Sequence, residues 1–245
     1  MADHPRLSRA PIIEALIDFR VEPDPTLRVP DLRQIQLALG TEAFPEVAPQ
    51  RQTTVQLSLD ATSEAKQVQD VGYLLRGADG LHVVQVQHGG FTFSRLKPYA
   101  DWNELLAGAR DAWAKYVAIA KPRRVTRVAV RTINRLELPL PVGDLRDWVR
   151  TVPDIPSTLP QGISEMFCRM ALPMRDGAVV ILTQALEPMP LGAERCGVIL
   201  DIDVFRVAEL SFSGDAPWAA LAPMRQLKND FFFECVTPRT LELCK

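Results

Sequence analysis

Alternating hydrophobic and polar residues in the first half of the chain predict a region made mostly of strands. At 12–21 the polar residues Glu14, Asp18 and Arg20 fall on one parity, as in a half-buried strand. A Pro-rich stretch ends this strand, and a short helix is predicted at 31–39, with an aspartate at its first position as N-cap. Further strands of this half are predicted at 53–59, 72–76 and 81–87.

The clearest helical pattern of the chain runs over 102–120, where apolar residues recur with i, i+3, i+4, i+7 spacing. Trp113 and Tyr116 lie on this apolar stripe, Asp101 is placed to cap the helix, and Pro122 closes it. We therefore expect the aromatic face of this helix to pack on the sheet.

The second half of the chain repeats the same order of elements. A long strand is predicted at 123–138, followed by a short helix at 145–149 with Asp144 as its cap. A final helical segment at 218–233 should break or restart at Pro223, because proline lacks the amide that the helix interior needs. The strands between these elements are predicted at 165–172, 178–186 and 198–207.

A single offset of 116 positions, the separation of Trp102 and Trp218, relates the two halves. The same offset lays Pro122 on Pro238, Ile12 on Val128, and Val83-Val84 on Ile199-Leu200. A shared offset of this kind favours an internal duplication, although the many prolines of the chain leave coincidence as the alternative.

These patterns together predict an α+β fold made of two tandem βαβββα units, 1–122 and 123–245, packed as one globular body. The units would form an extended or partly closed, mainly antiparallel sheet with the helices on one side. A pseudo-twofold axis between them would create a groove lined by equivalent strands.

The composition of the chain limits the classes of partner that it could bind. The chain has 245 residues, of which 47% are hydrophobic, and its net charge of -2 gives no overall attraction to nucleic acid or anionic lipid. No apolar run approaches the roughly 20 residues that span a bilayer, and the charged start, 1–9, does not read as a signal peptide. We expect a cytoplasmic protein with no membrane partner, and nucleic acid is disfavoured.

Groups suited to catalysis are scarce. The chain has 3 histidines, and its 4 cysteines are widely spaced with no C-x-x-C pair. No Walker-type loop and no G-x-S-x-G motif occurs. We expect no metal ion and no cofactor, and the sequence favours a protein that is not an enzyme without deciding the question.

The most unusual segment for binding is the predicted strand over 127–138. Alternation places Arg127, Arg131 and Arg135 on one face of the strand, and a ladder of guanidinium groups suits phosphates or carboxylates. Cross-strand acidic residues that neutralise these arginines are the alternative. Asn134 lies on the apolar parity, where its amide must find partners, and we expect it to tie down a loop or bulge.

A second candidate group is the pair Asp201 and Asp203, which share one face of an apolar strand. A D-x-D pair of this kind holds magnesium in several metal-dependent nucleotidyl transferases. Here no Gly-Ser turn precedes the aspartates, and the simpler interpretation is that they meet Arg131 and Arg135 across the sheet.

Four motifs, PIIEA at 11–15, RTINR at 131–135, LDID at 200–203 and the closing segment 232–237, extend over nearly the whole chain. With these motifs the sequence resembles a sporadically distributed bacterial family of uncharacterised proteins of about this length. Many members carry a histidine in the closing helix where this chain has Arg225, so no role of that histidine transfers. The sporadic distribution resembles that of defence-associated genes, and the resemblance implies no reaction.

The leading hypothesis is therefore a non-enzymatic binding or adaptor protein, as a component of a bacterial defence or toxin-neutralising system. We expect a protein partner, and homo-oligomerisation stays open. The alternative is a nucleotide- or phosphate-ligand-binding protein with metal-dependent phosphotransfer or hydrolase activity, with arginines on the phosphate and aspartates on magnesium. The candidate ligand-binding residues are Arg127, Arg131, Asn134, Arg135, Asp201 and Asp203.

Overall fold

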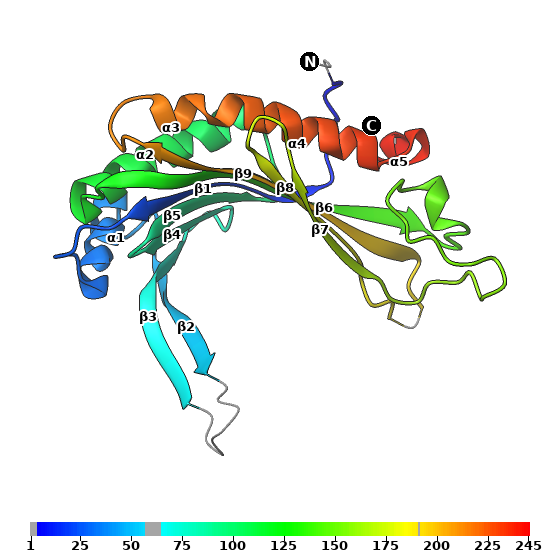
Figure 1. The fold of residues 1–245 in the computed structure, drawn as a ribbon, viewed down its shortest axis with the longest axis horizontal. Coiled ribbons are helices and arrows are strands. Elements are labelled where there is room, and N and C mark those ends of the chain that lie inside the picture. Colours follow the sequence, from blue (N-terminus) through cyan, green and yellow to red (C-terminus); the bar gives the residue numbers. More distant parts are fainter. Residues whose placement is uncertain (1–3, 57–64, 191) are drawn as a thin grey trace.

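The computed structural model describes residues 4–56, 65–190 and 192–245, which form one sheet with helices on one of its faces (Figure 1). The strands are β1 (Ile12–Glu22), β2 (Glu46–Gln56), β3 (Ala65–Arg76), β4 (His82–Gln87), β5 (Gly90–Leu96), β6 (Arg124–Pro139), β7 (Phe167–Pro173), β8 (Val179–Leu186) and β9 (Arg195–Leu210). Their order in the sheet is β2-β3-β4-β5-β1-β6-β9-β8-β7, and neighbouring strands pair antiparallel. The sheet is open, with β2 and β7 at its edges.

Two longer helices cover the centre of one sheet face. The helical elements are η1 (Val29–Arg33), α1 (Gln34–Leu39), α2 (Trp102–Ala120), η2 (Leu145–Asp147), α3 (Ala216–Ala219), α4 (Leu221–Cys235) and α5 (Pro238–Leu243). α2 packs on β5 and β1, and α4 packs on β6 and β9. In the described part of the chain, no helix combines the length and the apolar character that crossing a membrane requires.

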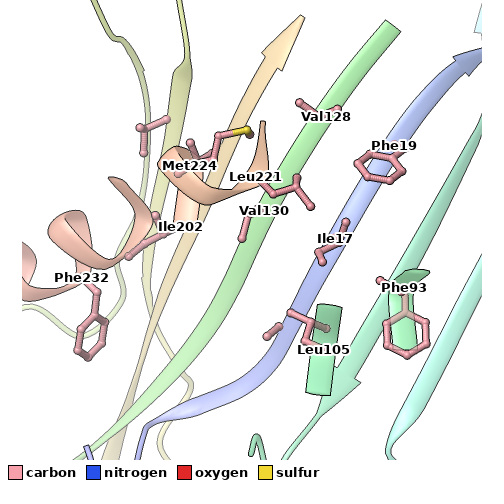
Figure 2. Close-up of a cluster of buried hydrophobic side chains, with 14 of the residues drawn as sticks. Ile17, Phe19, Phe93, Leu105, Val128, Val130, Ile202, Leu221, Met224 and Phe232 are labelled. Atoms are coloured by element: carbon pink, nitrogen blue, oxygen red, sulfur yellow. The ribbon is translucent and has the colours of Figure 1, made fainter. Parts of the chain in front are cut away.

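The main core lies between these helices and the sheet. Figure 2 shows Ile17 of β1 facing Leu105 of α2, and Val130 of β6 beneath α4. The aromatic face of α2 is buried as predicted, since Trp113 is 4% exposed. The ring of Phe19 on β1 makes edge contacts with Trp113 of α2 at 4.9 Å and with Trp218 of α3 at 5.0 Å. One β1 side chain therefore packs against helices from both halves of the chain.

The opposite sheet face, called the open face here, carries no helix of the described residues at its centre. Figure 1 shows that the sheet arches, with α2 and α4 on its outer side and the β2–β3 hairpin descending at one end. Strand alternation sends Asp18, Arg127, Arg131 and Asp203 to the open face, while Ile17 and Val130 point to the helices. The predicted charged face is thus the face opposite the helices.

Several boundaries differ from those predicted. β5 was not expected, so the first half has five strands and not four. Phe91 and Phe93 alternate with small or polar residues there, and His88 and Gly89 form the hairpin turn into this strand. The predicted strand 53–59 is the end of the longer β2, and its residues 57–59 lie outside the described residues. The predicted helix 145–149 is a single 3-10 turn.

The order of the strands in the sheet is nearly symmetric about the central pair β1 and β6. Outward from the central pair, β1 is followed by β5, β4 and β3, and β6 is followed by β9, β8 and β7. However, the offset of 116 lays Val83-Val84 of β4 on Ile199-Leu200 of β9, two strands at different places in this order. The fold is a mixed α and β structure with a mainly antiparallel, unclosed sheet, and the duplication is not confirmed.

Candidate functional site on the open face

The central strands of the open face carry a chain of ion pairs. Arg131 donates from Nε to Asp201 Oδ1 at 2.7 Å and from Nη2 to Asp201 Oδ2 at 2.5 Å. This two-point geometry is the strongest form of arginine–carboxylate pairing. The cross-strand pairing expected between these two residues is therefore present.

Arg127 joins the two halves of the sheet. Its guanidinium donates to Asp18 on β1 at 2.8 Å and to Asp203 on β9 at 3.1 Å. It also lies 4.3 Å from the centre of the Phe205 ring. Burial raises the pKa of Asp203, and the nearby Arg127 and Arg131 oppose this rise. Asp203 is thus compensated by arginines in the folded protein.

Arg135 does not meet the aspartates, contrary to the expectation. Its Nε donates to Glu187 at 2.7 Å, and its Nη1 contacts Glu137 on the same strand. Since β6 runs along β9, Arg135 lies opposite Ile199, four positions from its neighbour Arg131 and out of reach of Asp203. Sequence reasoning missed Glu187 because it follows the end of β8 and belongs to no strand alternation.

Asn134 lies on the other sheet face, apart from the five charged candidates. It is buried and donates from Nδ2 to the main-chain oxygen of Leu200 at 2.9 Å. The β1–β6 register shifts beside it, between Ile12 and Glu14, so Asn134 ties β9 to the strand at a bulge, as expected. The structure brings Arg127, Arg131, Asp201 and Asp203 together and separates Asn134 from them.

No protein-family model matches the chain, and no curated protein matches it either.

Apolar side chains lie beside the charged strands on the same face. Phe167 is 73% exposed and Val207 is 74% exposed, and both project from the open face of β7 and β9. We call the following open-face residues the apolar patch: Phe167, Ala171, Val179, Ile181, Phe205 and Val207. Arg169 of β7 and Thr183 of β8 lie on the same face between Phe167 and the other members. The patch was not predicted, although the run VVIL at 179–182 signals it, because both strand parities are apolar there.

The candidate aspartates of the open face are paired with arginines. Each of the two D-x-D carboxylates has an arginine within hydrogen-bonding distance, and in the described residues no three His, Cys, Asp or Glu side chains are grouped to hold a metal ion. An arginine paired in this way has little freedom to hold a phosphate. The geometry therefore favours the structural interpretation of the Arg/Asp group over the phosphotransfer alternative.

A separate cavity, lined by Asn134 among others, lies on the helix side of the sheet. Two of its cationic residues, Arg225 and Lys228, come from α4. Sequence reasoning missed Lys228 because nothing in a polar helix face marks which lysine meets a cavity.

Proposed function

We propose that this chain is a non-enzymatic binding or adaptor protein that recognises a protein partner through the open face. The observation that carries the proposal is the apolar patch. A sheet with one solvated face alternates apolar and polar residues, whereas strands covered on both faces are apolar throughout. The first half of β8 follows the second pattern, with Val179 and Ile181 on its open side, yet no described helix or strand forms a layer over it.

The energetics point the same way. Burying one large apolar side chain is worth roughly 1.5 to 3 kcal/mol, and Phe167 and Val207 leave nearly three quarters of their surface in water. A protein surface that covers these residues recovers this free energy. Large exposed apolar side chains beside charged residues are typical of protein-binding surfaces.

The paired charges next to the apolar patch orient the partner protein. Arg127 and Arg131 keep their carboxylate partners in the free protein, so binding does not require an unpaired charge to be buried. Charges at the border of an interface steer encounter and select among partners more than they add affinity. The ion-pair chain therefore acts as the polar border of the apolar patch.

The resemblance to a sporadically distributed bacterial family supports a role for this binding in a defence or toxin-neutralising system. The symmetric strand order about β1 and β6 supports a second proposal, that the two halves arose by duplication. Divergence of the halves would explain why the apolar patch lies on one half only.

The test uses two exposed patch residues and one matched residue on another surface. Phe167→Ser with Val207→Ser removes the apolar side chains, and Leu37→Ser on α1 changes an equally exposed residue. Tagged wild-type and variant proteins are isolated from the native host, and bound proteins are quantified by mass spectrometry. We expect a defined partner that the wild type and Leu37→Ser retain and the double variant loses. Retention of the same proteins by all three would refute recognition through the patch.

Size-exclusion chromatography with light scattering distinguishes a second copy of the chain from a different protein. A wild-type dimer that the double variant converts to monomer identifies the partner as the chain itself. A monomeric wild type leaves the captured protein as the partner.

A further inference from the structure

A cavity of about 700 Å³ lies on the helix side, away from the open face. It is bounded by the N-terminal segment 4–12, the start of α2, α4 and the helix-facing side of β6. Main-chain and side-chain bonds hold the N-terminal segment in place, since Arg9 N donates to Cys244 O at 3.0 Å and His4 contacts Asp230 at 2.6 Å. Cavities of this volume are typical of small-molecule sites.

Two cations of α4 line the cavity without an acidic partner in the described residues. Lys228 forms no ion pair there, and Arg225 lies over the Trp102 ring at 5.2 Å. The neighbouring acid on the helix, Asp230, is already bound to His4 and to Gln226 at 2.9 Å. A partly buried lysine without a carboxylate partner destabilises the fold. Such a residue in a cavity therefore indicates a functional site.

The floor of the cavity offers hydrogen-bonding atoms. Thr132 is 3% exposed, and it lines the cavity from β6. The side-chain nitrogen of Asn134 donates to the main-chain oxygen of Leu200, and the side-chain oxygen of Asn134 can accept a hydrogen bond from a ligand. A hydroxyl can donate or accept and an amide oxygen can accept, so both side chains suit polar atoms of a ligand.

The walls are aromatic on two sides. Tyr99 and Trp102 precede and begin α2, and Phe233 on α4 stacks on His4 with ring centres 4.3 Å apart. Flat surfaces of this kind favour a planar ligand body, and Arg225 beside the Trp102 ring extends the same surface.

We propose that this cavity binds a small organic anion with a planar body, whose carboxylate or phosphate is held by Lys228 and Arg225 and whose body contacts Tyr99 and Trp102. This site is independent of the partner surface on the open face. Thr132 and Asn134 hydrogen-bond to polar atoms of the ligand from the floor of the cavity.

The surrounding charges agree with an anionic ligand. The titratable groups around the cavity are His4 and Arg6 on the N-terminal segment, Tyr99 and Asp101 before α2, and Arg225 and Lys228 on α4, whereas β6 contributes uncharged side chains. Asp101 is the only carboxylate among the described lining residues, and its Oδ1 accepts from the amides of Asn103 and Glu104 as the helix cap. Burial, and next the charge of Arg225, lower the pKa of Lys228 to about 8. A bound anion would raise the pKa of Lys228 again. The affinity for the anion should therefore fall as the pH rises above about 8 and Lys228 loses its proton.

The experiment is calorimetric titration of the full chain with phenyl phosphate, benzoate and the neutral analogue phenol. We expect at least one anion to bind roughly tenfold more tightly than phenol, which corresponds to one charge-assisted hydrogen bond. The stronger of the two anions identifies the head group as phosphate or carboxylate. Benzoate keeps one charge across neutral and mildly alkaline pH, so its pH dependence reports Lys228. An equal affinity of phenol and both anions would overturn the proposal.

Variants locate the binding. Lys228→Met should weaken binding of the preferred anion at least roughly tenfold. Lys115→Met, which changes a lysine of α2 that pairs with Asp111 and does not line the cavity, should leave this affinity unchanged. Arg225→Gln, at an exposed position, tests the same site if Lys228→Met does not fold. Wild-type affinity in the cavity variants would show that the anion binds elsewhere and sink the assignment.

Discussion

Arg131 stands directly opposite Asp203 in the β6–β9 register, yet its guanidinium forms both of its hydrogen bonds with Asp201, on the diagonal. The diagonal choice leaves Asp203 to Arg127, which in turn reaches Asp18 on β1. Three adjacent strands are thereby connected by side chains as well as by their main chains. The two side chains of Arg131 and Asp201 should therefore contribute to stability as a coupled pair.

We predict that Arg131→Ala and Asp201→Ala each destabilise the fold by about 1 to 3 kcal/mol, because each leaves a partly buried charge without its partner. The double variant should lose less than the sum, with a coupling energy of about 1 kcal/mol from urea unfolding. Magnesium should not shift the melting temperature of the wild type, since Arg131 occupies the carboxylate. A magnesium shift that disappears in Asp201→Ala would instead support the phosphotransfer alternative.

A matched control for this cycle is the exposed cross-strand pair of Arg51 and Asp70, whose atoms lie 3.1 Å apart. Its coupling should stay below about 0.5 kcal/mol, because water screens exposed pairs. Equal coupling for both pairs would mean that burial adds nothing to the Arg131 pair.

Trp113→Ala should cost roughly 3 to 5 kcal/mol of unfolding free energy through cavity formation. Trp113 lies against Phe19, Phe91 and Tyr116, at ring distances of 4.9 to 5.5 Å. Urea unfolding measures the loss, and Phe167→Ala on the exposed patch serves as the control with an expected change within about 0.5 kcal/mol. A small loss at Trp113 would contradict its place in the core.

Lys228→Met should stabilise the ligand-free protein near neutral pH by on the order of 1 kcal/mol. The pKa of Lys228 is lowered to about 8 in the fold from 10.5, so its charged form is disfavoured there. The destabilisation by its charge is complete below a pH of about 8 and is absent above the unfolded value, where the lysine is neutral in both states. The advantage of the variant should therefore shrink as the pH rises from 8 to 10.5. Urea unfolding at neutral and alkaline pH checks this, and an advantage independent of pH would contradict it.

Gly72→Ala should destabilise the protein by about 1 to 3 kcal/mol, because the added Cβ would lie 2.1 Å from the main-chain oxygen of Val86. Gly72 adjoins the register shift at which the β2–β3 pairing skips Val71. Gly162→Ala is the control, since a Cβ there meets no atom within 4 Å. Thermal melts compare the two variants, and an unchanged melting temperature for Gly72→Ala would show that β4 can move away.

Strand alternation and helical periodicity were enough to predict most elements, because those signals are local. They predicted α2 with its cap Asp101, and they placed Arg127 and Asp203 on one sheet face. β5 follows β4 directly through a tight hairpin turn, and no strand was predicted beyond that turn. Sheet order depends on contacts between distant segments, and the offset of 116 did not reproduce it.

The same distinction between local and long-range contacts applies to the candidate site. The pairing of Arg131 with Asp201 followed from parity and charge, whereas that of Arg135 with Glu187 depends on where β8 ends. The cavity residues Lys228 and Thr132 lie on elements far apart in sequence, and no spacing rule connects them. Side chains that meet only through tertiary packing leave no local pattern.

Both proposed binding regions share β6. Its arginines at 127 and 131 face the open side, while Thr132 and Asn134 on the alternate parity reach the cavity. Insertion or deletion of a single residue in this strand would exchange the two sets of side chains between the faces. In evolution, β6 can therefore accept many substitutions but not a change of length, and relatives that keep both regions must align through 127–134 without a gap.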